Sequence, residues 1–225
     1  MYSSLVLDVD STLSGIEGID FLAARRGPEV GERIARLTER AMAGAVPLDS
    51  VYGERLRLIQ PALADIQALQ HAYVEALAPD ARTCIARLRA AGVRLVLVSG
   101  GIRQAIEPLA RQLGFADDEL HAVTLAFDAT GSYAGFDAAS PLATQRGKAA
   151  VVGILVGDGT LPRPVLAVGD GSTDIAMRDT ADVFAAFTGF ARRPNVVAAA
   201  AFAVASFPDL ERATLAGSPG VAAKD

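Results

Sequence analysis

The chain contains few of the residues from which disulfide frameworks and transition-metal clusters are built. Cys84 is its only cysteine, so neither an internal disulfide nor a cysteine metal cluster can form. The only histidines, His71 and His121, lie too far apart in sequence to show the spacing of a metal-binding motif. We expect Cys84 to be a small buried residue of a helix.

Long apolar runs and clusters of basic residues are also missing. No apolar stretch reaches the roughly 18 residues that cross a bilayer, and the N-terminus lacks the pattern of a signal peptide, so we expect a cytoplasmic protein. The formal net charge is −5, with no run rich in Lys or Arg, which argues against nucleic acid or an anionic membrane as a partner. The sequence leaves the oligomeric state open.

What the chain does have is a hydrophobic fraction of 51% in 225 residues, enough for one α/β domain with or without an insertion. Short apolar runs end at polar residues or glycine, and helical patterns separate them. This alternation predicts an α/β fold with a doubly wound, Rossmann-like parallel sheet. The expected strands cover residues 5–7, 94–98, 165–168 and 183–186.

The segment between the first two expected strands is helical in pattern over residues 16–77. It is far longer than an ordinary connection, so we interpret it as a cap domain inserted over the functional site. The predicted organisation is core at 1–14, helical cap at 15–77 and the rest of the core at 78–225. Turn residues flanked by apolar ones also predict a small hairpin near residues 121–137.

The most informative segment follows the first expected strand, where Asp8 and Asp10 are two positions apart. A strand would direct both carboxylates to one face, and two anions about 4 Å apart repel by roughly 4 kcal/mol at an effective dielectric near 20. Such a pair is tolerable around a cation or a shared proton, which suggests a site for Mg²⁺ and phosphate. A solvated turn is the alternative for this segment alone.

Two further segments predict anion-binding groups. Ser99, Gly100 and Gly101 follow the second expected strand, and we expect their backbone N–H groups near a helix N-terminus, although a simple cap by Ser99 is the alternative. Lys148 is expected in the first turn of a helix, where it opposes the helix dipole unless an anion lies nearby. On that segment alone, a solvated lysine would be the better interpretation.

A fourth segment follows the third expected strand and opens a helix. Asp170 is expected at the strand end, as Asp8 is, and can supply a hard oxygen ligand. Asp174, four residues later, can orient Lys148 or a metal-bound water. The segment is not a dinucleotide-binding fingerprint, because Asp174 stands where that motif has Gly or Ala.

Taken in order, these four segments resemble the motifs of the haloacid dehalogenase-like hydrolase superfamily. Within it, residues 8–13 together with Glu17, Arg55 and the segment 40–42 resemble the phosphoserine phosphatases. The resemblance covers most of the chain. It implies a Mg²⁺-dependent phosphoric monoester hydrolase that acts on a small substrate, O-phospho-L-serine, through an aspartyl-phosphate.

The resemblance also implies a role for each matching residue. Asp8 would be the nucleophile and Asp10 the acid and then the base, while the carboxylates of Asp8 and Asp170 and the backbone carbonyl of Asp10 would bind Mg²⁺, with Asp174 in support. The phosphoryl group would be held by Ser99, Gly100 and Lys148. Glu17 and Arg55 would bind the substrate ammonium and carboxylate, with Met42 beside them. Thr173 stands where many relatives have Asn, so its role stays open.

Three alternatives stay open on the sequence. The same chemistry could act on another small phosphomonoester or transfer the phosphoryl group to an alcohol. A phospho-receiver module also carries a phosphorylatable aspartate on a doubly wound sheet, but the long insertion and Asp10 argue against it. An inactive binding scaffold would have lost one of Asp8, Asp10, Lys148 or Asp170, and all four are present.

Overall fold

The computed structural model describes residues 1–42 and 48–217. Its centre, within these ranges, is a six-stranded sheet in the order β3-β2-β1-β6-β7-β8, with every pair of neighbours parallel. This confirms the predicted α/β fold with a doubly wound parallel sheet. The strands are β1 (Ser4–Leu7), β2 (Arg94–Ile102), β3 (Leu120–Val123), β6 (Val165–Gly169), β7 (Val183–Phe187) and β8 (Phe202–Val204).

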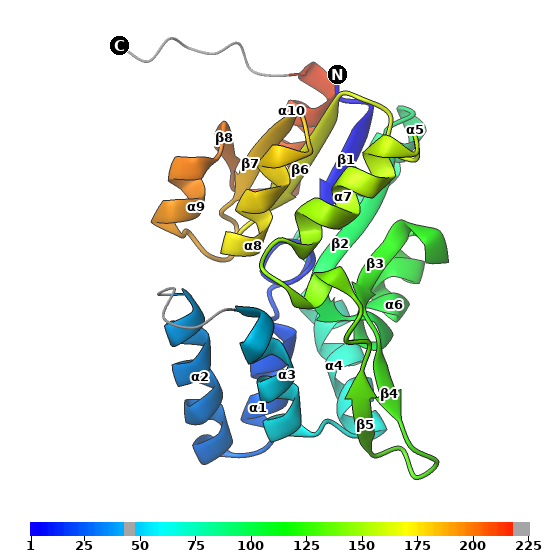
Figure 1. Cartoon of the computed structure of the whole chain (residues 1–225). Helices are drawn as coiled ribbons and strands as arrows, with labels where there is room; N and C mark the ends of the chain where they lie inside the picture. The colour runs from blue at the N-terminus through cyan, green and yellow to red at the C-terminus, as the bar shows by residue number, and fades with distance from the viewer. Residues whose placement is uncertain (43–47, 218–225) are drawn as a thin grey trace.

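Strand β1 lies in the middle of this sheet, and all four of its residues are buried. Both faces of a central parallel strand are covered, which explains why Leu5, Val6 and Leu7 form a continuous apolar run instead of alternating with polar residues. In Figure 1, α7 and α8 lie over the near face, while α5 and α10 pack together behind the sheet. The core helices are α5 (Ala81–Ala90), α6 (Arg103–Gln112), α7 (Gly147–Gly157), α8 (Ser172–Ile175), α9 (Pro194–Ala199) and α10 (Phe207–Ala216).

The chain between β1 and β2 forms helices beyond the carboxyl ends of the strands, before returning to the core at α5 (Figure 1). We call α1–α4 the helical insertion. Pro47 is typical of the first turn of a helix and predicts that the third of these helices begins there, but it lies outside the described residues. The described helices of the insertion are α1 (Gly18–Ala24), α2 (Pro28–Met42), α3 (Leu48–Ile59) and α4 (Leu63–Glu75).

A two-stranded antiparallel hairpin, β4 (Leu125–Phe127) and β5 (Tyr133–Phe136), stands beside the insertion (Figure 1). Its Phe136 ring packs against the Tyr52 ring of α3, with centroids 5.4 Å apart. The predicted hairpin is confirmed, but its expected first residues, 121–123, belong to β3 of the main sheet. The hairpin therefore packs against α3 of the insertion.

Helix α4 of the insertion docks on α6 of the core at an interruption in the hydrogen bonding of α6. Pro108 lies inside α6 and has no N–H to donate to the carbonyl of Gln104 one turn earlier. That carbonyl instead accepts a hydrogen bond of 2.8 Å from Nε2 of Gln70 on α4. The proline thus leaves an acceptor free for the docking of the insertion.

The second expected strand is longer than predicted. It continues through Ser99, Gly100 and Gly101 to Ile102, so these residues lie directly before α6, near a helix N-terminus as expected. The alternative of a cap by Ser99 is wrong, because the N-cap of α6 is Ile102. The sheet is irregular at these residues, because the ladder with β1 ends at Leu97 and the ladder with β3 shifts register between Val98 and Ile102. Cys84 is buried in α5, as predicted.

Candidate active site

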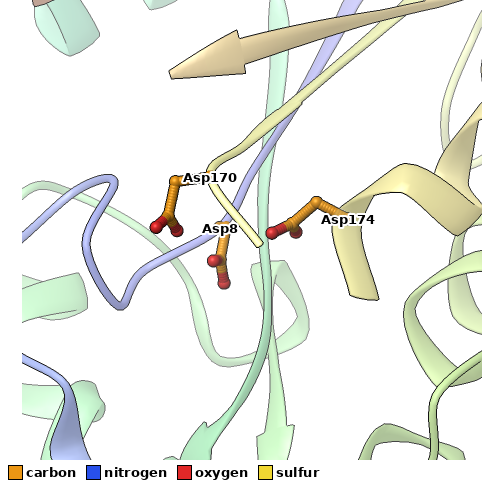
Figure 2. Close-up of side chains that lie close together, drawn as sticks. All are labelled: Asp8, Asp170 and Asp174. Carbon is orange, nitrogen blue, oxygen red and sulfur yellow. The ribbon is translucent and has the colours of Figure 1, made fainter. Parts of the chain in front are cut away.

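Three carboxylates gather where β1 and β6 end. Asp8 directly follows β1 and Asp170 directly follows β6, and these strands are neighbours in the sheet. Asp174 comes from α8 and points toward the other two (Figure 2). One oxygen from each of the three lies within 4.8 Å of the others, and all three side chains are buried. The sheet therefore brings together the two strand-end carboxylates, Asp8 and Asp170, and the third member of the cluster is Asp174 and not Asp10, the predicted partner of Asp8.

Lys148 lies inside this cluster. Its Nζ is 2.6 Å from Oδ1 of Asp8 and 2.7 Å from Oδ1 of Asp174, and the residue is 4% exposed. The interpretation as a solvated first-turn lysine is therefore wrong. Gly147 allows this burial, because a Cβ there would lie 1.8 Å from the carbonyl oxygen of Pro141. The N-terminus of α7 can thus approach closely enough to place Lys148 between the carboxylates.

The charges of these buried groups depend on one another. Burial and the nearby carboxylates of Asp174 and Asp10 raise the pKa of Asp8 well above its ordinary value, and Lys148 opposes that rise. Burial alone would lower the pKa of Lys148, but Asp174 and Asp8 outweigh it and raise that pKa above its usual value. Lys148 is therefore a permanent cation beside the carboxylate of Asp8.

The carboxyl group of Asp10 is held by groups from the helical insertion. Its Oδ1 accepts hydrogen bonds from the backbone N–H of Gly18 at 2.9 Å and from the hydroxyl of Tyr73 at 2.6 Å. Burial, followed by the charge of Glu17, raises the pKa of Asp10 to about 6, despite the lowering effect of these hydrogen bonds. A carboxyl group with such a pKa can both donate and accept a proton near neutral pH.

These groups surround a cavity of about 220 Å³ between the core and the insertion. Core residues supply its acidic and basic floor, and α1 and α3 supply its opposite wall. The polar and charged lining residues are Asp8, Asp10, Glu17, Asp20, Tyr52, Arg55, Gln145, Lys148, Asp170, Ser172, Thr173, Asp174 and Arg193. The cavity is thus large enough for a small phosphorylated metabolite and contains both signs of charge.

Arg55 enters the cavity from α3. Its guanidinium lies 5.8 Å from the centre of the Tyr52 ring, and its Nε is buried without a hydrogen-bond partner among the described residues. Burial lowers the pKa of Arg55, although guanidinium groups remain protonated in proteins. A buried donor without an acceptor is costly, so this end of the cavity fits an anionic ligand.

Other predicted residues occupy different positions. Gly100 and Thr173 line the cavity, whereas Ser99 is fully buried and absent from the lining. The Ser99 hydroxyl lies 3.4 Å from Oδ2 of Asp10 and accepts a hydrogen bond from the N–H of Gly101. Met42 ends α2, and its side chain lies outside what the structure describes.

The sequence interpretation did not select Arg193, Asp20 or Tyr73. Arg193 precedes α9, pairs with the carboxylate of Asp170 and lies 3.2 Å from that of Glu17. It therefore joins the core to the first helix of the insertion. Asp20 lies in the same segment as Glu17, which the sequence did select, but nothing in the pattern around Arg193 or Tyr73 indicated a place at the site.

The carboxylates fit a hard divalent cation. Asp8 and Asp170 offer buried oxygen atoms and the cluster has no sulfur or imidazole ligand among the described residues, which suits Mg²⁺ better than zinc. Burial raises the pKa of Asp8, and a cation beside it would favour its ionised form.

Comparisons with known proteins agree with this geometry. A phosphoserine phosphatase of Rattus norvegicus is 36% identical over 207 residues, covering 92% of this chain and 91% of the relative. A chloroplastic phosphoserine phosphatase of Arabidopsis thaliana is 34% identical, covering 92% of this chain and 70% of the relative.

None of the helices within the described ranges is both long and apolar enough to span a membrane.

Solved structures share the fold. A phosphoserine phosphohydrolase-like protein from Francisella tularensis superposes with a TM-score of 0.81 at 22% identity, covering 95% of this chain and 99% of the other. A substrate-bound phosphoserine phosphatase gives a TM-score of 0.77 at 22% identity, covering 93% of this chain and 97% of the other. The sequence model of the haloacid dehalogenase-like hydrolase family matches residues 5–179. The chain belongs to the haloacid dehalogenase-like hydrolases.

Proposed function

We propose that this chain is a Mg²⁺-dependent phosphoserine phosphatase that cleaves O-phospho-L-serine to serine and phosphate. One observation carries the proposal: the buried pair of Asp8 and Lys148 shares its cavity with Arg55, whose Nε has no hydrogen-bond partner in the described part of the chain. The first two groups suit a phosphoryl group, and the third suits a carboxylate on the same small molecule.

In this proposal, Asp8 is the nucleophile. Its oxygen attacks phosphorus, the bond from phosphorus to the serine oxygen breaks, and an aspartyl-phosphate forms. Attack of one anion on another is unfavourable unless positive charge lies at the reacting atoms. Lys148 supplies such a charge 2.6 Å from Asp8, and Asp174 holds the lysine in place. Catalysis then depends mainly on positioning and on electrostatic stabilisation.

Asp10 moves the proton in both halves of the reaction. It gives a proton to the serine oxygen as that group leaves, and then takes one from the water that attacks the aspartyl-phosphate. Its pKa of about 6 suits both roles. We also propose that residues 15–77, which contain the helical insertion, are the cap domain that excludes bulk water during these steps.

Mg²⁺ would be held by the carboxylates of Asp8 and Asp170 and the backbone carbonyl of Asp10. When bound, it would neutralise negative charge on the phosphoryl oxygens. The acidic cluster supports this assignment because its three buried carboxylates outnumber the two cations that pair with them, Lys148 and Arg193. Gly100 and Thr173, which line the cavity, are proposed to contact the phosphoryl group, together with Ser99.

Glu17 and Arg55 are proposed to bind the ammonium and carboxylate of the substrate, with Met42 beside them. The carboxylate of Glu17 already accepts a hydrogen bond of 2.7 Å from the hydroxyl of Ser11 and lies near the guanidinium of Arg193. These contacts fix the carboxylate at the rim of the cavity. The pair would distinguish phosphoserine from phosphomonoesters that lack one of the two charges.

Arg55→Ala tests the substrate assignment most sharply. We expect kcat/KM for L-phosphoserine to fall by the equivalent of about 2–5 kcal/mol, because the substrate carboxylate loses its partner in a partly desolvated cavity. For phosphoethanolamine, which has no carboxylate, kcat/KM should fall much less. Arg57→Ala is the matched control, since Arg57 lies on the same helix but is exposed.

Equal losses of kcat/KM on both substrates would contradict the carboxylate assignment. Arg55 would then serve the folding of α3 or a general attraction of phosphate. Activity confined to another phosphomonoester, or transfer of the phosphoryl group to an alcohol, would identify the alternative function within the same family.

A further inference from the structure

Tyr73 contacts the acid–base residue from outside the cavity. It lies on α4 of the helical insertion, its side chain is fully buried, and it is not among the residues that line the cavity. Its hydroxyl donates a hydrogen bond of 2.6 Å to Oδ1 of Asp10. Tyr73 therefore touches the carboxyl group on the side away from the space that a substrate would occupy.

The position of this hydroxyl is fixed by contacts on the core. The backbone carbonyl of Tyr73 accepts a hydrogen bond of 3.0 Å from the hydroxyl of Ser14, in the segment that leads from β1 to the insertion. One turn earlier on α4, Gln70 bonds to the carbonyl of Gln104 in α6. These two hydrogen bonds tie helix α4, and with it Tyr73, to the core.

Gly18 shares the same carboxylate oxygen and makes room for the hydroxyl. Its backbone N–H lies 2.9 Å from Oδ1 of Asp10. A Cβ at this position would stand 2.4 Å from the hydroxyl oxygen of Tyr73, closer than real contacts allow. The absence of a side chain at Gly18 therefore permits both donors to reach one oxygen.

Two donors on Oδ1 define what the other oxygen can do. Oδ2 of Asp10 faces Gly101, where a Cβ would lie only 2.7 Å away, and accepts a single, longer hydrogen bond of 3.4 Å from the hydroxyl of Ser99. A carboxyl oxygen that already accepts two hydrogen bonds is a poor place for a proton, because the proton would meet two donors. The transferable proton therefore belongs on Oδ2.

We propose that Tyr73 is a positioning residue that orients the carboxyl group of Asp10 so that Oδ2 is its proton-transferring oxygen. This inference rests on the phosphatase function proposed above. As the bond from phosphorus to the leaving oxygen breaks, its electron pair stays on that oxygen, which takes the proton from Oδ2. In the second step, Oδ2 takes a proton from the water whose oxygen bonds to phosphorus, and the bond from phosphorus to Asp8 breaks.

The test compares an alkyl with an aryl phosphate in Tyr73→Phe. The serine alkoxide needs a proton to leave, whereas p-nitrophenolate leaves without one. In rapid-quench single turnovers, we expect serine release from phosphoserine to slow about 10- to 100-fold, a part of what general acid catalysis contributes, with a much smaller change in KM. The rate of the p-nitrophenol burst should stay within about threefold of wild type, because that step does not use the proton.

Tyr133→Phe is the matched control. It removes the same hydroxyl group, but from strand β5 of the hairpin, and Tyr133 is not among the residues that line the cavity. It should therefore keep the wild-type ratio of serine release to p-nitrophenol burst. An equal slowing of both reactions in Tyr73→Phe, or no slowing of either, would overturn the positioning role.

A second measurement tests the geometry without turnover. Gly18→Ala should lower the melting temperature more in wild type than in the Tyr73→Phe background, because the second variant lacks the oxygen that the new methyl group would meet. An equal fall in melting temperature in the two backgrounds would show that the Tyr73 hydroxyl does not lie beside Gly18, and it would overturn the inference.

These outcomes are distinct from failure of the substrate proposal. A wild-type enzyme that gives a p-nitrophenol burst but ignores phosphoserine would contradict the substrate alone. Glycerol phosphate, another alkyl ester, then takes the place of phosphoserine in the comparison, with the same expected slowing in Tyr73→Phe.

Discussion

Lys148→Met should cost the protein a large part of its stability as well as its activity. Met keeps the length of the side chain but removes the charge that lies 2.6 Å from Asp8 and 2.7 Å from Asp174. Opposite charges about 4 Å apart attract by roughly 4 kcal/mol at an effective dielectric near 20, and removing one partner of a buried pair costs about 3–5 kcal/mol. We expect a loss of that size in the free energy of unfolding.

For a chain of this length, each kcal/mol shifts the melting temperature by about 2–4 °C, so the expected fall is about 6–20 °C. The measurement is thermal and urea unfolding in metal-free buffer, together with phosphate release in Mg²⁺. Arg146→Met is the control, because its pair with Asp179 at the start of the same helix is 71% and 56% exposed and such pairs contribute at most about 1 kcal/mol.

The double variant Lys148→Met/Asp174→Asn separates charge from packing. Removing one of the two stranded anions should recover part of the melting temperature without restoring activity. A fall of less than about 2 °C in Lys148→Met would refute the buried bridge. No recovery in the double variant would show that lost packing, and not stranded charge, causes the instability.

The remaining predictions concern the nucleophile and the stability of the fold in acid. Asp8→Asn keeps the shape of the side chain but is a poor nucleophile, so phosphate release should vanish while the circular dichroism spectrum is retained; normal turnover would contradict the assignment of Asp8. Burial alone would raise the pKa of Glu119, but hydrogen bonds from Arg89 and a backbone N–H, with the charge of Arg94, leave that pKa lowered. Ionised Glu119 therefore stabilises the folded chain at pH values above the ordinary glutamate pKa of about 4.3, and this stabilisation is lost as the pH falls through the lowered pKa of Glu119. Glu119→Gln should lower the free energy of unfolding by about 1–2 kcal/mol at neutral pH, and the difference from wild type should shrink as the pH falls through the lowered pKa of Glu119, whereas a constant difference would disprove the ion-pair explanation.

The acidic cluster was predictable because it depends on strand ends. Asp8 and Asp170 each directly follow a buried strand, and parallel strands bring their carboxyl ends to one edge of a sheet. Lys148 was placed at the phosphoryl group only by the resemblance to the family, because its own segment favoured a solvated lysine. Its burial was not predictable, since it depends on the close approach of Gly147 to Pro141.

The strands that were missed have weak local patterns. Strand β8 is only three residues long, and β3 carries His121 within an apolar stretch that also suited a hairpin. Their extended conformation comes from pairing with β7 and β2, which lie elsewhere in the sequence. Pairing of Ile102 with Val123 of β3 likewise carries β2 beyond its two glycines, where the ladder shifts register.

The residues that hold the site together were the least predictable. Tyr73 reaches Asp10 across 63 positions, and Arg193 reaches Glu17 across 176. Contacts at such separations leave no periodicity or spacing in the chain. They follow from the docking of α4 on α6 and from the path of the loop before α9.

The central claim is tested most directly by phosphate release from L-phosphoserine, with and without Mg²⁺. Phosphothreonine, phosphoethanolamine and glycerol phosphate serve as comparisons, in enzyme first depleted of metal with a chelator. The account predicts that phosphoserine gives the highest kcat/KM, that depletion stops turnover and that Mg²⁺ restores it. Full activity in metal-depleted enzyme, or no hydrolysis of phosphoserine by the Mg²⁺-loaded enzyme, would contradict the account.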